Sequence, residues 1–112
     1  MKSRFVGKLT ELALSAAGWQ PFRDGIAIRR LWGDPTAGAS AALLRYVPGA
    51  QGPKHRHTGF ELIFVISGSQ SDERGTYGAG SFVVNPDGDE HSVRSDEGCT
   101  VLIVWERPIE FV

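Results

Sequence analysis

The chain has 112 residues, with 12 Lys and Arg against 13 Asp and Glu and a formal net charge of −1. This length corresponds to one domain, and the lack of a basic block in the sequence argues against nucleic acid or an anionic membrane as a partner. The longest unbroken apolar runs have five residues, too few to span a bilayer, and the single cysteine excludes an internal disulfide framework. We therefore expect a small cytoplasmic domain.

Residues 1–24 are expected to form an N-terminal arm that packs against the rest of the chain or against a neighbouring subunit. Within the arm, Thr10–Ala17 is a helix candidate with Thr10 as a possible N-cap, and it is too short to be stable alone. Glu11 interrupts the apolar stretch that follows Lys2 and Arg4, which argues against a secretory signal peptide.

Residues 25–112 are expected to form one β-domain. Glycines and prolines divide this part of the chain into short runs rich in Val, Ile, Leu and aromatic residues, a pattern typical of an all-β sandwich or barrel. The Asn85–Gly88 segment predicts a tight turn, because Pro presets φ and Gly tolerates positive φ. The predicted strands are Ile26–Trp32, Ala41–Val47, Glu61–Ser67, Ser81–Val84 and Cys99–Trp105.

Three histidines, His55, His57 and His91, are the only ones in the chain. His55 and His57 are two residues apart, so both rings project from one face of an extended segment. Glu61 begins the next apolar run, and His91 opens a short strand after the predicted turn. If these strands are neighbours, three imidazoles and one carboxylate converge on one divalent transition metal, such as Zn, Fe, Ni, Co or Mn. Four protein ligands would leave one or two positions of the ion open.

Two spaced motifs contain these four residues. They read Gly49-x5-His55-x-His57-x3-Glu61-x6-Gly68 and Gly80-x5-Pro86-x-Gly88-x2-His91. Both resemble the two motifs of the cupin superfamily. The resemblance implies an all-β fold, a single small cupin (jelly-roll-like) β-barrel, and metal ligands at His55, His57, Glu61 and His91. Ser95 departs from the pattern, because the family has Asn there; that Asn is not a metal ligand.

Within the cupins, residues 19–105 resemble the ChrR-type branch, the cupin half of ChrR anti-sigma factors and its stand-alone relatives. The similar sequence segments are Trp19–Pro21, Leu43–Gly49, Ser71–Tyr77 and Glu97–Cys99. The anti-sigma domain of that branch has its own His/Cys zinc site. Because residues 1–24 contain no His or Cys, we expect that this chain alone does not hold a sigma factor.

Three functions fit this resemblance. The first is a metal-dependent dioxygenase or related oxidoreductase, with Glu61 as a catalytic base that briefly leaves the metal; the ligand set resembles that of quercetin- and diketone-cleaving cupins. The second is a non-catalytic ligand-binding or sensing module of ChrR type. A metal-free sugar isomerase, with His and Tyr as acid–base pair, ranks third. All three need a small-molecule ligand or substrate, and the sequence does not decide between the first two.

The pocket lining and the oligomeric state follow from weaker patterns. Arg45 and Tyr46 alternate on a predicted strand, so only one of them faces inward, as a carboxylate-binding cation or as a proton donor. We expect a homodimer, with residues 1–12 or an exposed sheet edge as the contact.

Several remaining side chains are expected to have structural roles. Cys99 is predicted to be a small buried hydrophobe. The acidic residues beside His91 are expected to be solvated, with a hydrogen bond to an imidazole as the alternative; they are Asp87, Asp89 and Glu90. The large aromatic residues are expected in the core or barrel wall, with Trp32 or Trp105 also able to line a pocket; they are Trp32, Phe60, Phe64, Phe82 and Trp105.

Overall fold

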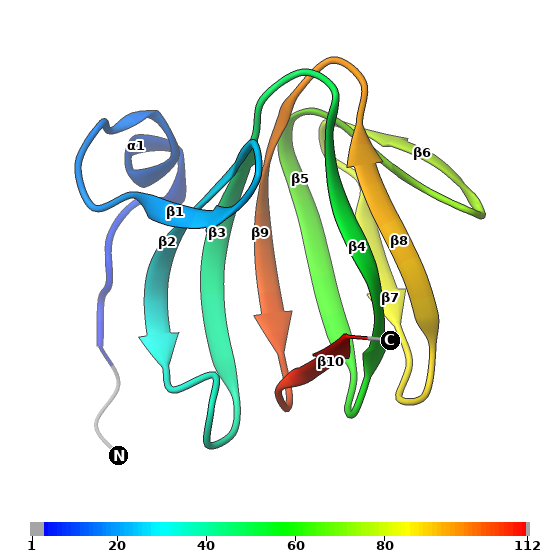
Figure 1. Ribbon diagram of the computed structural model, residues 1–112. Coiled ribbons are helices and arrows are strands. Elements are labelled where there is room, and N and C mark those ends of the chain that lie inside the picture. Colours follow the sequence, from blue (N-terminus) through cyan, green and yellow to red (C-terminus); the bar gives the residue numbers. More distant parts are fainter. Residues whose placement is uncertain (1–3, 112) are drawn as a thin grey trace.

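The computed structural model describes residues 4–111, which form one short helix and ten strands (Figure 1). No helix in this range is long and apolar enough to cross a membrane. All strand pairs are antiparallel, which confirms the predicted all-β class. The elements are α1 (Leu9–Leu14), β1 (Gln20–Arg23), β2 (Ile26–Gly33), β3 (Ser40–Tyr46), β4 (Ala50–His57), β5 (Glu61–Asp72), β6 (Gly75–Gly78), β7 (Phe82–Asn85), β8 (Glu90–Ser95), β9 (Cys99–Trp105) and β10 (Ile109–Phe111).

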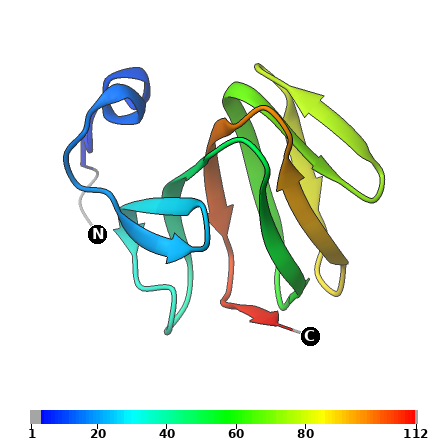
Figure 2. The same cartoon turned by 45° about the horizontal axis from the view of Figure 1, so that its top comes forward.

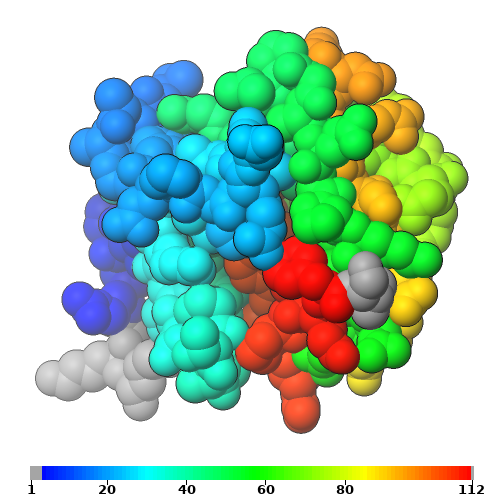
Figure 3. Space-filling model, viewed as in Figure 1, coloured from blue at the N-terminus to red at the C-terminus, as the bar shows by residue number. Residues whose placement is uncertain are grey.

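The strands are hydrogen-bonded in the order β1-β2-β3-β9-β5-β8-β4-β10, and β6 and β7 pair with β5. This sheet curls so that β4 and β8 lie opposite β2, β3 and β9 (Figures 1 and 2). The C-terminal strand β10 pairs with the free edge of β4, and in the space-filling view its red atoms lie beside the green atoms of β4 (Figure 3). The fold is a small open β-barrel.

The long strand β5 connects the two halves of the barrel. Its first part, to Gly68, pairs with β9, and its last part, from Ser69, pairs with β6. Gly68 has φ +72°, and a Cβ there would lie 1.9 Å from the carbonyl oxygen of Gly98. Only glycine therefore fits where β5 passes from one half of the barrel to the other.

The core consists of alternate side chains that point into the barrel. Tyr46 is 4% exposed in this core, while Arg45 points outward, so the structure selects Tyr46 as the inward residue. Cys99 and Trp105 are buried here, as predicted. The core residues are Ile26, Ile28, Ala42, Leu44, Tyr46, Ala50, Ile63, Val65, Val93, Cys99, Val101, Ile103 and Trp105.

The N-terminal segment covers the outer face of β2 and β3. Arg45 donates to the carbonyl of Ala13 and stacks over the ring of Trp19 at 4.0 Å. The helix is shorter than predicted, and its N-cap is Lys8 rather than Thr10, without a side-chain cap. Within the predicted arm of residues 1–24, β1 pairs with β2, so the sheet begins before Gly25. The division into arm and barrel stays a prediction.

The predicted burial of several aromatic side chains is wrong. Phe60, Phe64 and Phe82 are 40%, 39% and 63% exposed, and Trp32 is 44% exposed. Phe64 and Phe82 are register partners on β5 and β7, with side chains on the face opposite the core. Apolar residues occupy both faces of these strands, so the sequence does not show the alternation that would have placed the two phenylalanines outside.

Candidate metal centre

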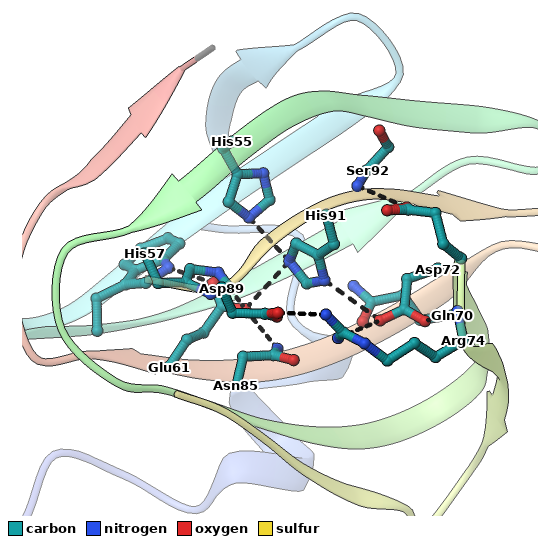
Figure 4. Close-up of polar contacts among 12 residues, drawn as sticks. His55, His57, Glu61, Gln70, Asp72, Arg74, Asn85, Asp89, His91 and Ser92 are labelled. Atoms are coloured by element: carbon teal, nitrogen blue, oxygen red, sulfur yellow. Dashed lines mark hydrogen bonds and ion pairs between the residues drawn. The ribbon is translucent and has the colours of Figure 1, made fainter. Parts of the chain in front are cut away.

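Strand pairing brings all four predicted ligands together inside the barrel. His55 and His57 lie on the inward face of β4, and His55 is the register partner of His91 on β8. Glu61 is the first residue of β5, after the short turn that follows His57. The four side chains are buried, and one ligand atom from each lies within 4.8 Å of the others (Figure 4).

The individual distances suit a single ion. The Nε2 atoms of His55 and His91 are 2.9 Å apart. Glu61 Oε1 lies 3.1 Å from His57 Nε2 and 3.6 Å from His91 Nε2. Ligands at about 2.1 Å from one ion, separated by angles of 90–110°, are themselves about 3.0–3.4 Å apart.

The hydrogen bonds of two rings fix which nitrogen faces the centre. His55 Nδ1 donates to the carbonyl of Pro53 at 3.1 Å, and His91 Nδ1 donates to Asp72 Oδ2 at 3.2 Å, because these oxygens can only accept. In the neutral rings both Nε2 atoms are then unprotonated, and their lone pairs face each other. His57 Nε2 faces Glu61 Oε1, and the Nδ1 atom of the same ring is buried without a hydrogen-bond partner. Opposed lone pairs beside a carboxylate are the donor set of a divalent transition metal, so the residues fit such an ion.

Two neighbouring strands fix the carboxylate of Glu61. Its register partners are Asn85 on β7 and Trp105 on β9. Asn85 Nδ2 donates to Oε1 at 3.0 Å, and Trp105 Nε1 donates to Oε2 at 2.6 Å. Neither contact is visible in the sequence, where Asn85 reads only as a turn residue, because both depend on cross-strand register.

The carboxylate that orients His91 comes from Asp72, not from the adjacent acidic residues. Asp72 ends β5 and lies beside His91 (Figure 4), and its Oδ1 also accepts from Tyr77 Oη at 3.1 Å. Asp89 pairs instead with Arg74, which lies 3.9 Å from Asp72. Among the described residues no imidazole bonds to the side chain of Asp87, Asp89 or Glu90, so that alternative is wrong; the expectation of a solvated side chain is also wrong for Asp89, whose Oδ2 is buried.

The carboxylates of the cluster are held ionised. Burial opposes ionisation of Glu61, but hydrogen bonds and charge interactions with His57 and His91 outweigh it and lower its pKa. Burial also opposes ionisation of Asp72, where hydrogen bonds from the Arg74 backbone and His91 lower the pKa. Burial lowers the pKa of His55, which favours its neutral, metal-ligating form. The cluster thus presents the negative carboxylate of Glu61 and the neutral imidazole of His55 to an ion, with the negative Asp72 behind His91.

A small cavity adjoins the cluster. Its volume is about 30 Å³, close to the share of one water molecule. His55, Glu61, Tyr46 and Arg23 contribute its polar side chains, and the other walls are mainly apolar, with Ile109 and Phe111 of β10 among them. The hydroxyl of Tyr46 accepts from Gln70 at 3.3 Å, and burial raises the pKa of this phenol.

A curled antiparallel barrel with three histidines and one glutamate gathered inside it defines the protein as a cupin. More narrowly, the chain belongs to the ChrR cupin-like domain family, whose sequence model matches residues 10–109. The predicted resemblance is thereby confirmed. The anti-sigma-E factor ChrR of Cereibacter sphaeroides is 35% identical over 80 residues, which cover 69% of this chain and 38% of that protein.

Solved structures agree with this assignment. The complex of Rhodobacter sphaeroides SigE with the anti-sigma ChrR matches with a TM-score of 0.74 and 27% identity, over 83% of this chain and 50% of that chain. An acetylacetone dioxygenase from Acinetobacter johnsonii matches with a TM-score of 0.85 over 100% of this chain and 79% of that chain. Its identity is 18%, so this second likeness shows the fold alone.

Proposed function

We propose that the chain is a metal-dependent cupin that binds a small molecule at one divalent transition ion. His55, His57, Glu61 and His91 would hold the ion. The observation that carries the proposal is the convergence of three imidazoles on a carboxylate oxygen, with 2.9 Å between the Nε2 atoms of His55 and His91. A bound ion would supply a Lewis-acid position for a ligand in the adjacent cavity.

The residues around Glu61 support the role of a fixed ligand. Both of its oxygens accept hydrogen bonds, from Asn85 and from Trp105, and these bonds hold the carboxylate in one orientation. A catalytic base that leaves the ion would have to break them. The catalytic role of Glu61 therefore stays a prediction, and metal ligation is the role that we propose for it.

Metal analysis of protein purified without an affinity tag tests the proposal. We expect about one equivalent of a transition metal per chain, and thermal unfolding at a lower temperature after chelation. Glu61→Gln keeps the shape of the side chain and removes its charge, so its metal content should fall well below stoichiometric. Protein that retains no transition metal, and whose unfolding temperature no added metal changes, would contradict the proposal.

Oxygenase chemistry is a second candidate. The observation that favours it is the mainly apolar wall beside His55 and Glu61, which suits the carbon skeleton of a substrate; the space there holds about one water molecule, so a substrate would have to displace part of this wall. The Acinetobacter johnsonii acetylacetone dioxygenase is similar in fold. Oxygen uptake by Fe-, Ni- or Mn-loaded protein with β-diketones and flavonols should exceed that of the metal-free protein; equal rates would exclude this candidate.

A non-catalytic sensing role is the alternative within the family. The matched relative is an anti-sigma factor, and the chain spans 38% of its length, so binding of a sigma factor stays a proposal for this chain. Two results together would support the sensing role and contradict the oxygenase. The first is metal binding with no turnover of any tested substrate, and the second is capture of a protein partner by a tagged chain only in its metal-loaded form. Cytoplasmic location likewise stays a prediction.

The predicted homodimer also remains a proposal, and an exposed apolar surface supports it. Register pairs connect the six side chains of this outer apolar face, which are Leu62, Phe64, Phe82, Val84, Leu102 and Val104. Phe64, Phe82 and Val84 are 39%, 63% and 55% exposed, and the other three are partly exposed. Phe5, Val6 and Leu14 of the arm are 84%, 53% and 87% exposed. A self-complementary apolar face is the usual contact of a symmetric dimer, so a second copy of the chain is the occupant that we propose.

A further inference from the structure

A second and larger cavity lies next to the metal cluster. Its volume is about 130 Å³, and it is continuous with the smaller cavity, because the two share Phe22, Arg23, Trp105, Ile109 and Phe111. It lies where the β1–β2 hairpin, the turn after β2 and the strand β10 meet, and these segments surround β9 in the space-filling view (Figure 3). None of the four proposed metal ligands lines it.

One buried polar atom in this cavity has no partner. Ser40 is 2% exposed, and its Oγ makes no hydrogen bond in the described part of the chain. Ser40 begins β3 and is the register partner of Trp105, so it belongs to the inward row of the strand. A buried hydroxyl without a partner is destabilising, and because Ser40 lines the cavity, a change of its side-chain rotamer would bring this hydroxyl to a hydrogen-bonding group bound there.

Two arginines bring positive charge to the same cavity. Arg30 follows Ile26 and Ile28 in the inward row of β2, where the row reaches the end of the barrel. Arg23 comes from the β1–β2 hairpin, and its guanidinium lies 4.1 Å from the ring centroid of Phe111. Within residues 4–111, neither Arg23 nor Arg30 forms an ion pair with a carboxylate.

The remaining walls suit an apolar group of limited size. Phe22, Trp105 and Phe111 supply aromatic surface. A cavity of about 150 Å³ is large enough for a benzene ring. A guanidinium that stacks on an aromatic ring still directs its N–H groups sideways, where they can bind a carboxylate in bidentate fashion.

We propose that this cavity binds a small organic carboxylate with one aromatic or branched apolar group. Arg23 and Arg30 bind the carboxylate, Ser40 donates or accepts one hydrogen bond, and the apolar group packs against Trp105. The apolar walls favour this class over inorganic phosphate. Because Trp105 also donates to Glu61, the bound acid contacts a residue that orients the metal cluster.

Benzoate is the probe that tests this site. In a Trp19→Phe, Trp32→Phe background, fluorescence reports on Trp105 alone, the one tryptophan that lines the cavity. We expect saturable binding of benzoate in both the metal-loaded and the chelator-treated protein. Benzamide, which has the same shape without the charge, should bind at least 10-fold more weakly. Equal affinity for benzamide, or displacement of benzoate by equimolar inorganic phosphate, would overturn the proposal.

Matched variants test whether the arginine charge in this cavity binds the carboxylate. Arg30→Gln should weaken benzoate binding at least 10-fold, and Ser40→Ala should weaken it several-fold. Arg94→Gln is the control, because Arg94 is an exposed arginine that pairs with Asp96 outside the cavity. If Arg30→Gln leaves the affinity unchanged, or Arg94→Gln lowers it as much, the proposal is wrong. Metal content should stay the same in all three variants. A loss of benzoate binding is therefore distinguishable from a loss of metal binding, and each proposal can fail without the other.

Discussion

Asp72 Oδ2 accepts a hydrogen bond from His91 Nδ1 at 3.2 Å and thereby orients the ring whose Nε2 faces the cluster. Asp72 is itself held by the hydroxyl of Tyr77 and by the backbone N–H of Arg74 at 2.8 Å. A carboxylate behind a metal-ligating imidazole fixes its tautomer and raises its basicity. The affinity for the ion should therefore depend on a residue that does not touch it.

Asp72→Asn is expected to weaken metal binding 10–100-fold, the usual effect of removing such a partner. Competition against a chromophoric chelator measures the affinity. Asp87→Asn is the control, since Asp87 is an exposed turn residue close to His91 in sequence. Equal losses in the two variants would mean that net charge, not the contact with His91, sets the affinity.

The stability of the metal-free protein should fall in acid. The pKa of Asp72 is lowered from 3.8 in the folded chain, so its contribution is fully present above about pH 4 and is lost as pH falls through the folded pKa. Urea unfolding of chelator-treated protein at pH 5 and at pH 3 measures the change. The decrease should be smaller in Asp72→Asn than in the wild type, and an identical decrease would refute the assignment to Asp72.

Trp105→Phe should destabilise the protein by about 1–3 kcal/mol, because it leaves the buried Oε2 of Glu61 without its N–H donor. Denaturant unfolding gives the free-energy change. Trp32→Phe makes the same chemical change at a 44% exposed side chain, and its effect should stay within about 0.5 kcal/mol. Comparable effects at the two positions would show that the bond to Glu61 contributes little.

Gly68→Ala is expected to cost at least about 2 kcal/mol in the free energy of unfolding, because it combines positive φ with a clash against the Gly98 backbone. Gly78→Ala on β6 is the matched control, since its added Cβ meets no atom within 4 Å. Thermal unfolding of both variants compares the two. A Gly68→Ala protein as stable as Gly78→Ala would disprove the constraint at the bend.

Phe82→Asp tests the outer apolar face. A charge at this position would be buried between two copies, so the variant should be monomeric at concentrations where the wild type is dimeric. Light scattering or analytical ultracentrifugation gives the mass. Val47→Asp introduces the same charge at a 54% exposed side chain that is not on this face, and it should leave the mass unchanged. A monomeric wild type at high concentration would end the dimer proposal.

The convergence of the four proposed ligands could be predicted from the sequence. His55 and His57 share a face because strand side chains alternate, and Glu61 follows after a turn too short to place it elsewhere. The Asp87–Gly88 turn returns the chain toward β4, where the N–H of Gly88 donates to the carbonyl of His57 at 2.8 Å. The steps from His55 to Glu61 are local and follow from spacing, whereas the place of His91 depends on the pairing of β8 with β4, which the resemblance to the cupins implied.

Contacts that depend on pairing between distant strands could not be read from the sequence. Asn85 and Trp105 meet at Glu61 only because β7 and β9 flank β5 in one register. Asp72 reaches His91 only because β5 continues past Gly68 into the other half of the barrel. The outer positions of Phe64 and Phe82 could not be predicted for the same reason. They depend on which face of the sheet formed by β3, β9 and β5 points toward the core.

The course of β5 limits how the chain can vary in length. Glu61 and Asp72 stand at its two ends, one facing the imidazoles and the other behind His91. Insertion or deletion of a single residue between them would turn one carboxylate to the opposite face of the strand. We expect natural length differences among homologues to fall in segments such as Asp34–Gly38, where added residues extend into solvent and leave both acidic groups in place.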